Sequence, residues 1–598
     1  MFLPVNKQDL QSRSIPSLDI ILISGEAYVD HPSFGIAIIG RFLEKYGYKV
    51  GIISQPDINS DSDFIALGKP NLFFGISSGN MDSMVNHYTA QKKLRSSDAY
   101  SPDGKVGLRP NRAVIKYTQK IKTLFKDIPI ILGGIEASLR RIPHYDFWSD
   151  NLRNSILFDS KADAIVYGMG ERAIIEIANL ISAGKTIKEI IDVPGTVVPV
   201  KKPDKEGMIL PEYTKQISKE TFHKFNVLFD KNFQNKIIYQ KCLGRFLKHN
   251  IPSKSLSTEE MDAIYSLPFE RKPHPKYNKQ KIPAFEQIRL SVTSHRGCFG
   301  GCSFCTIGYH QGKTIQSRSI NSIRKELESI TNEDYFHGTI TDVGGPSANM
   351  YGLFCKLGIS DTCNRQSCLF PTICPHLETS LAKNKELLKK LSAIDKIKHL
   401  FVSSGIRFDI ALLDDKYIKT ITKNHISGLL KLAPEHSVTH ILKLMNKPNF
   451  SLYEDFEKKY FKFSKMYDKK QFIVPYIIVG HPGETLEDTL ELAIKLKQKN
   501  IKLTQIQEFT PTPMTLSTCM YYSGLNFFTG EKIHIPKGRE IHLMKALIQW
   551  YKPENKKYIM EALKMIHKVG MASKILPYNK DKNPKLNKKK NISHKKRR

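Results

Sequence analysis

The first third of the chain alternates short apolar runs with a segment whose apolar residues recur at the spacing of a helix. Such runs are typical of strands that are buried on both faces of a parallel sheet. The helical pattern covers Ile36–Tyr46, between the first two runs. This alternation predicts an open α/β sheet with ligands near the carboxyl ends of its strands. The predicted strands are Asp19–Ser24, Lys49–Ser54, Leu72–Ser77, Ile128–Leu132 and Ala164–Tyr167.

Six further strand candidates recur from residue 287 onward, with helical segments between them. Six β/α units predict a partial TIM-type barrel, in which the chemistry lies at the carboxyl ends of the strands. Distinctive loops, rich in Gly, Pro, Cys or charged residues, follow these strands and therefore fall on one rim. The predicted strands are Gln287–Ser294, Gly338–Val343, His399–Ser404, Ile426–Leu432, Phe472–Val479 and Thr504–Phe509.

The pattern divides the chain into four parts. We predict a Rossmann-like α/β domain over residues 1–200, a connecting region over 201–283, the barrel over 284–562, and a C-terminal extension over 563–598. The extension ends in a basic tail from about residue 577, where Asp581 is the only acid. Such a block of like charges is predicted to be disordered.

The chain of 598 residues carries a formal net charge of +33, which has two interpretations. Clustered positive charge would indicate a nucleic-acid partner. Most of the lysines are scattered, however, in a chain that is rich in Lys, Ile and Asn throughout. Nucleic-acid contact through the basic tail is therefore a hypothesis that the sequence does not favour.

Neither a membrane span nor a secretory signal is expected. No apolar run approaches the ~20 residues that a membrane-spanning helix needs. The first residues, Met1–Lys7, lack a basic stretch followed by an apolar core. The expected location is the cytoplasm, where nine cysteines argue against a disulfide framework.

Three cysteines, Cys298, Cys302 and Cys305, follow the first predicted barrel strand with the spacing C-x3-C-x2-C. Three thiolates on a short glycine-containing loop can hold three irons of a 4Fe–4S cluster and leave the fourth iron open. Zinc is the alternative, with His295 or His310 as a fourth ligand, although zinc sites favour paired C-x2-C motifs. The cysteines therefore predict a metal centre on the rim of the barrel.

A second group of cysteines follows the second predicted barrel strand. Its four thiols could form a zinc site or an auxiliary iron–sulfur cluster. The spacing C-x7-C-x4-C-x5-C matches no common zinc motif, and buried thiols beside a helix are an equal alternative. The group comprises Cys355, Cys363, Cys368 and Cys374.

Four polar residues on the loops after the third and fourth barrel strands are candidates for contacts to a cofactor or substrate. Salt-bridged residues of the barrel wall are an equal interpretation of the same positions. The candidates are Arg407, Asp409, Glu435 and His436.

The cysteine triad resembles the signature of the radical S-adenosylmethionine (SAM) superfamily, with Phe304 at the aromatic position before the third cysteine. The resemblance implies that the open iron binds SAM and that electron transfer cleaves SAM to a 5'-deoxyadenosyl radical. Two glycine-containing rim loops resemble the elements that meet the methionine end and the adenine of SAM, except that Pro346 replaces the usual Glu of the first. Glycine allows the close approach of a ligand. The implied SAM-binding residues are Phe304, Gly344, Gly345, Gly480, Pro482, Gly483 and Glu484.

The N-terminal part resembles the cobalamin-binding-type Rossmann domains that precede many radical SAM barrels. Gly133–Ala137 and Gly168–Glu171, each after a predicted strand, carry this resemblance. Those domains that bind cobalamin through a lower histidine use Asp-x-His-x-x-Gly, whereas Asp30 and His31 are adjacent here. We therefore predict no cobalamin bound through His31, and we expect this domain to shape or cap the active site.

Strings along nearly the whole chain resemble the YgiQ family of radical SAM proteins. The resemblance implies an α/β enzyme with one 4Fe–4S cluster and SAM, but it names neither substrate nor electron donor. The alternatives are an RNA-modifying radical SAM methyltransferase or methylthiotransferase and a non-catalytic protein that binds zinc and RNA. The strings are Ser78–Tyr88, Ser294–Cys298, Gly344–Tyr351, Leu432–His436 and Phe509–Met514.

Overall fold

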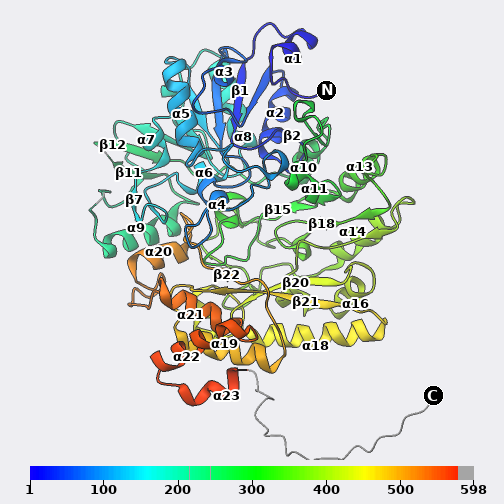
Figure 1. Cartoon of the computed structure of the whole chain (residues 1–598). Coiled ribbons are helices and arrows are strands. Elements are labelled where there is room, and N and C mark those ends of the chain that lie inside the picture. The colour runs from blue at the N-terminus through cyan, green and yellow to red at the C-terminus, as the bar shows by residue number, and fades with distance from the viewer. Residues whose placement is uncertain (215, 243, 577–598) are drawn as a thin grey trace, which may run out of the picture.

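The computed structural model describes residues 1–214, 216–242 and 244–576 (Figure 1). These residues form two α/β halves, one above the other in Figure 1, with the last helices at the far end of the second half. The basic tail, and with it the hypothesis of nucleic-acid contact through that tail, lies outside the described residues.

The first half is built on a nine-stranded sheet with the order β10-β11-β12-β9-β8-β5-β4-β1-β3. Alternate residues of its parallel strands pack on opposite faces. Leu22 lies with helices α2 (Gly35–Lys45) and α8 (Glu171–Ser182), whereas Ile23 lies with α5 (Ala113–Leu124). All five predicted strands are confirmed, as β1 (Ile20–Ser24), β3 (Val50–Ser54), β4 (Phe73–Ser77), β5 (Ile130–Leu132) and β8 (Ala164–Val166).

Residues 201–283, which we expected to connect two domains, also extend this sheet. After β9 (Thr196–Val200), the strands β12 (Arg245–His249), β11 (Ile238–Cys242) and β10 (Met208–Ile209) continue it towards one edge. Two helices, α9 (Lys219–Asn232) and α10 (Thr258–Tyr265), belong to the same segment. The segment is thus more than a connection, and the predicted domain boundaries stay predictions.

The second half contains the parallel strands of the predicted partial barrel. In chain order, β14 (Ser291–Thr293) pairs with β18 (Asp342–Gly344), and β17 (Thr339–Ile340) pairs with β19 (His399–Leu400). The longer β21 (Phe472–Val479) lies between β20 (Leu429–Glu435) and β22 (Gln507–Glu508). The outer helices are α13 (Ile320–Ile330), α14 (Ala382–Ser392), α16 (Asp415–Asn424), α18 (Phe450–Met466) and α19 (Leu486–Gln498).

The first, third and last barrel strands are shorter than predicted, and the third is reduced to His399–Leu400. Within Gln287–Ser294 only Ser291–Thr293 is a strand, because helix α11 (Pro283–Ile288) takes the first positions and begins with a proline, which suits a first helical turn. The sixth strand is reduced to two residues. Beyond it, α21 (Arg539–Ile548) packs on α19, and α22 (Lys556–Met565) runs across the predicted boundary at residue 562.

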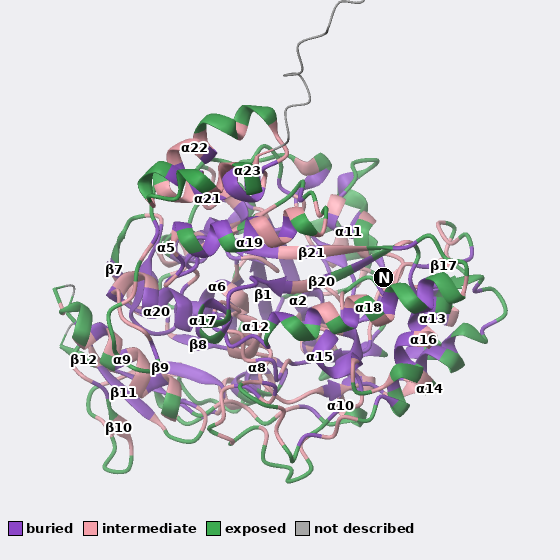
Figure 2. Ribbon diagram, turned by 90° about the horizontal axis from the view of Figure 1, so that it is seen from below, coloured by how far each residue is buried: buried purple, intermediate pink, exposed green. Residues whose placement is uncertain are grey.

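Buried residues gather on the strands and on the inner faces of the helices, whereas helices such as α14 and α22 expose their outer faces (Figure 2). Within the described residues, none of the helices combines the length and the apolar character needed to cross a lipid bilayer.

Glu26 lies two residues after β1, where the strand order of the parallel sheet reverses between β1 and β4. Its side chain is fully buried. Its Oε2 accepts a hydrogen bond from the backbone N–H of Asn80 at 2.9 Å, and its Oε1 has no partner in the described part of the chain. Burial raises the pKa of Glu26 from 4.5 to about 7.

A carboxyl whose pKa is raised by folding stabilises the folded chain while it is protonated, and this contribution is lost as the pH rises from about 4.5 through about 7. The shift corresponds to about 3 kcal/mol. We therefore expect the thermal midpoint of the wild type to fall relative to that of Glu26→Gln between about pH 5 and about pH 8. A difference between the two midpoints that does not change with pH would contradict this assignment.

Candidate functional site

The cysteine triad lies on a loop that leaves the barrel after β14 and is closed by two short strands. β15 (His295–Arg296) pairs with β16 (Gln316–Ser317), and the triad lies between them. Two glycines permit this loop. A side chain at Gly297 (φ +87°) would lie 2.0 Å from the Thr314 carbonyl oxygen, and one at Gly301 (φ +60°) would lie 2.2 Å from that of Gln366.

The structure brings Cys298, Cys302 and Cys305 together around one small cavity of about 80 Å³. All three thiols are half-buried. Burial is the main cause that raises the pKa of Cys298, and the neighbouring thiol of Cys302 adds to it. Burial and the two other thiols likewise raise the pKa of Cys305 to about 12. Thiols in such a place ionise when a bound cation compensates the charge, so this donor set fits a thiolate-ligated iron cluster.

The two histidines of the zinc alternative face elsewhere. His295 and His310 line a second, larger cavity and are not among the described residues that line the thiol cavity. The Nδ1 of His295 lies 2.9 Å from Ser294 Oγ, and the Nδ1 of His310 lies 3.1 Å from Ser138 Oγ. Neither is therefore placed as a fourth ligand beside the three thiols.

Arg407 lies against the triad and is held by Asp409. Its Nη1 is 3.7 Å from the Sγ of Cys302, while its Nε and Nη2 donate to Asp409 Oδ1 at 3.0 Å and Oδ2 at 2.5 Å. Burial disfavours the charged form of both groups, but the attraction between Arg407 and Asp409 outweighs the effect of burial. The pKa of Arg407 is therefore raised and that of Asp409 is lowered. The guanidinium is thus a fixed positive charge beside the thiols.

Glu435 and His436 also have partners within the chain. The carboxylate of Glu435, a residue with φ of +66° at a register shift of β20, lies 3.6 Å from Lys447 Nζ. Burial raises the pKa of Glu435, and Lys447 opposes the rise. The Nε2 of His436 lies 3.4 Å from Glu484 Oε1. The geometry therefore pairs Glu435 with Lys447 and places His436 beside Glu484 without a hydrogen bond from its Nε2 in the described residues, and the contact of these rim residues to a cofactor or substrate stays a prediction.

The Gly480–Thr485 loop contacts the triad loop through aromatic rings. Phe304 meets His481 edge-on, with ring centroids 6.4 Å apart. The carboxylate of Glu484 accepts hydrogen bonds from the N–H groups of Gly480 and His481 at 2.7 and 3.2 Å. Glu484 therefore holds its own loop in shape, which the sequence resemblance did not reveal.

The Gly344–Gly345 loop contacts the residues that precede the triad. The carbonyl oxygen of Gly344 accepts hydrogen bonds from the N–H and the Oγ of Ser294, at 2.7 and 3.0 Å. A side chain at Gly345 would lie 2.5 Å from the ring of His295. The two glycines and Pro346 line the larger cavity, of about 590 Å³, between the two halves of the molecule.

The second cysteine group lies beside the triad loop. The N–H of Cys368 donates to the Phe299 carbonyl at 3.0 Å, and the N–H of Cys374 donates to the Cys368 carbonyl at 2.8 Å. Burial, followed by the Cys374 thiol, raises the pKa of Cys368 to about 11. The backbone of Cys355 forms an antiparallel β-bridge with that of Leu377. No three His, Cys, Asp or Glu side chains in the described residues are placed to hold a single metal ion, and the second site stays a prediction.

Contacts between the two halves are the part of the site that sequence reasoning missed. Arg296 donates to Glu171 Oε1 at 2.5 Å, and Tyr309 donates to Asp230 Oδ1 at 2.6 Å. Both Arg296 and Glu171 are buried. The sequence carries no signal for Asp230, because it lies outside the buried stripe of α9, which consists of Phe222, Phe225 and Phe229.

Both ring nitrogens of His31 are engaged within the chain. Its Nδ1 accepts from the N–H of Ser33 at 3.1 Å, and its Nε2 lies 2.9 Å from Arg271 Nη2. Burial, followed by the charge of Arg271, lowers the pKa of His31 well below its ordinary value. The expectation that His31 ligates no cobalamin stays a prediction.

Comparison with protein families finds three matches along the chain. Residues 2–291 match the model described as radical SAM N-terminal, and residues 292–496 match the radical SAM superfamily. Residues 504–583 match a domain of unknown function, DUF3362.

Curated relatives match the chain over almost its whole length. UPF0313 protein GSU2873 of Geobacter sulfurreducens is 44% identical over 96% of both chains. UPF0313 protein YgiQ of Salmonella typhimurium is 43% identical over 95% of this chain and 88% of its own.

Two solved structures show a weaker likeness. One is the radical SAM methyltransferase TsrM of Kitasatospora setae with cobalamin and a [4Fe-4S] cluster bound, at a TM-score of 0.48 and 12% identity over 84% of this chain and 77% of that chain. The other is the cobalamin-dependent SAM radical enzyme OxsB with aqua-cobalamin bound, at a TM-score of 0.46 and 12% identity over 85% of this chain and 56% of that chain.

The contact of Gly345 with His295 can be tested by Gly345→Ala. The added methyl group must displace the His295 ring, and overpacking of this kind costs about 1–3 kcal/mol. We expect a lower thermal midpoint than in the wild type. Gly570→Ala is the matched control, because a side chain at Gly570 meets nothing within 4 Å. Equal midpoints for the two variants would contradict the close packing at Gly345.

Proposed function

The chain belongs to the UPF0313 family of radical SAM enzymes, and on that premise we propose that Cys298, Cys302 and Cys305 hold one 4Fe–4S cluster that serves the cleavage of SAM. The observation that carries this proposal is that three half-buried thiols from one loop line a single cavity. A cluster held there, once reduced by a one-electron donor, would supply the electron for the cleavage of SAM to methionine and a 5'-deoxyadenosyl radical, and that radical would take a hydrogen atom from a substrate.

Two loops of the chain are proposed to position SAM. Gly344 and Gly345 offer backbone groups beside the residues that precede the triad, as the methionine end of SAM requires. The loop with Gly480, Pro482 and Gly483 would meet the adenine end, supported by the contact of His481 with Phe304. Glu484 would act through the shape of this loop, since its carboxylate is already used by backbone N–H groups.

Arg407 is proposed to stabilise the charged form of the site. Three thiolates in a partly buried cavity repel one another, and a fixed positive charge nearby lowers that cost. Arg407 lies 3.7 Å from the Sγ of Cys302. Because Asp409 holds the guanidinium in this position, the role proposed for Arg407 is limited to its orientation and its positive charge.

We expect the wild type, purified without oxygen, to be brown and to form 5'-deoxyadenosine from SAM once it is reduced with dithionite. Cys302→Ala should lose both the colour and the product, because it removes one of three cluster ligands. Cys242→Ala is the matched control, since Cys242 is a single buried thiol on β11, outside the site. A colourless wild type with stoichiometric zinc would contradict the proposal. A brown wild type that forms no 5'-deoxyadenosine would also contradict it.

The second cysteine group is proposed as a further metal site, supported by the position of Cys368 and Cys374 beside the triad loop. Cys363→Ala should then lower the metal content per chain while the colour that depends on Cys302 persists. Metal analysis of Cys363→Ala and Cys302→Ala, side by side, separates the two sites. A metal content equal to that of the wild type would assign Cys363 to packing.

A further inference from the structure

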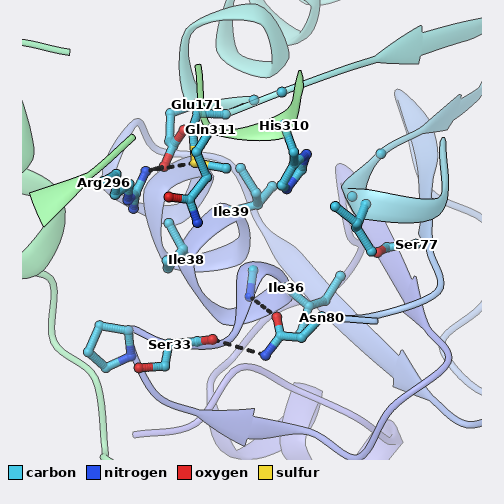
Figure 3. Close-up of a pocket in the computed structure, with 18 of the residues that line it drawn as sticks. Ser33, Ile36, Ile38, Ile39, Ser77, Asn80, Glu171, Arg296, His310 and Gln311 are labelled. Carbon is cyan, nitrogen blue, oxygen red and sulfur yellow. Dashed lines mark hydrogen bonds and ion pairs between the residues drawn. The ribbon is translucent and has the colours of Figure 1, made fainter. Parts of the chain in front are cut away.

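The cavity of about 590 Å³ lies where two sets of parallel strands present their carboxyl ends (Figure 3). On one side are the ends of β4, β5 and β8, with Ser77, Gly133 and Gly168. On the other side are Arg296 and Gly345, which follow the first two barrel strands. Ligands of both fold types bind at these ends, and this volume is that of a small-molecule pocket.

The charges that line this cavity do not suit an anionic ligand. Arg296 is the only one of the chain's 91 Lys and Arg residues found among the described residues that line it. Its charge is already paired with Glu171 at 2.5 Å. Asp342 adds a further carboxylate to the lining. Burial lowers the pKa values of His295 and His310 to about 4, so both rings are neutral near neutral pH.

Side chains of the protein also lie at the N-termini of α2 and α8, which reach the cavity. A free helix N-terminus attracts phosphate, because its first N–H groups lack partners. At the start of α2, the N–H of Gly35 donates to Asn80 Oδ1 at 3.2 Å. At the start of α8, no side chain caps the first N–H groups, but the first residue is the buried Glu171, whose carboxylate disfavours a second negative group there. Phosphate groups therefore find no unpaired Lys or Arg side chain in the described lining, and they would meet the carboxylate of Glu171 at the start of α8.

The remaining lining offers apolar contacts and a hydrogen-bonding edge. Ile36 and Ile39 of α2 face the cavity from one wall, and His310 and Gln311 face it from another (Figure 3). The Nε2 atoms of His310 and Gln311 have no hydrogen-bond partner in the described residues. Both residues lie just after the triad, and Ile307 lines this cavity and the thiol cavity alike.

We infer that this cavity binds the substrate of the radical reaction and that the substrate is a small, phosphate-free organic molecule. It is uncharged or singly cationic, with an apolar body against Ile36 and Ile39 and polar atoms that pair with His310 and Gln311. The inference rests on the proposed function, since it places the substrate beside the SAM loop Gly344–Gly345. It disfavours RNA, whose phosphates this lining would not accommodate.

The test uses full-length protein with its cluster and, as the probe, the small-molecule extract of cells grown in deuterated water. A parallel arm uses the RNA of the same cells. After reduction with dithionite, the deuterium content of 5'-deoxyadenosine reports hydrogen transfer from a substrate. Ultrafiltration followed by mass spectrometry identifies compounds that the protein retains without turnover. Ile39→Trp should obstruct the cavity, because Ile39 is half-buried and a larger side chain there grows into open space.

We expect deuterium transfer and retention of a phosphate-free compound with the small-molecule extract alone. Ile39→Trp should lower the deuterated fraction and the retention by at least about tenfold, and Ile39→Phe should have a smaller effect. Ile65→Trp is the matched control, since Ile65 is 48% exposed on α3 (Ser62–Ile65). The thermal midpoint and the cluster absorption confirm that each variant is folded.

Three results would overturn the inference: transfer from the RNA arm, a retained compound that carries phosphate, or Ile39→Trp and Ile39→Phe that both behave like Ile65→Trp. Formation of 5'-deoxyadenosine without deuterium in every arm would also overturn it, while leaving the proposed function in place. Absence of 5'-deoxyadenosine from every arm would contradict the proposed function itself, and the inference would fall with it.

Discussion

The buried ion pair between Arg296 and Glu171 sets the relation of the two halves of this molecule. Glu171 follows β8 of the large sheet, and Arg296 follows β14 of the barrel, two residues before Cys298. Removing one member of such a pair typically costs about 3–5 kcal/mol, because the other charge is left buried and unpaired. The pair therefore holds the carboxyl edges of both strand sets face to face. A cavity between them, next to the thiols, is the geometric consequence.

The triad loop is held by residues from several other loops of the rim. Ser303 donates its N–H to Met445, and the side chains of Asn446 and Ser367 donate to the carbonyl oxygens of Gly301 and Gly300. These partners are separated by up to 145 residues along the chain. Sites held in this way keep their geometry before a cofactor arrives, which is what a cluster with only three protein ligands needs. Glu484 gives the neighbouring Gly480 loop the same kind of support.

The sequence predicted those parts of the molecule whose pattern is local. Strands buried on both faces, such as Ile20–Ser24, are continuous apolar runs, and the triad is compact in sequence. The strands β11 and β12, which lie just inside one edge of the sheet, were not predicted because Gln240 and Lys248 are buried polar residues inside them. Lys248 is tolerated there since its ammonium reaches Asp192 and Asp204, which lie elsewhere in the chain. The sequence could not predict the contacts Arg296–Glu171 and Tyr309–Asp230 either, because only the folded chain brings the partners together.

The strong positive charge of the chain says little about what the site binds. Ten Lys and Arg residues are buried in the described part of the chain, and nine of them, all except Arg141, pair with a carboxylate. Burying a charge without a partner costs free energy, which explains why most of the buried Lys and Arg side chains are paired. Among the described residues, the excess of positive charge therefore lies on side chains outside the buried interior, where salt screens it over about 10 Å. Inside the molecule the lining of each cavity determines its ligand, and the lining between the two halves, with Arg296 already paired, favours a molecule that carries no phosphate.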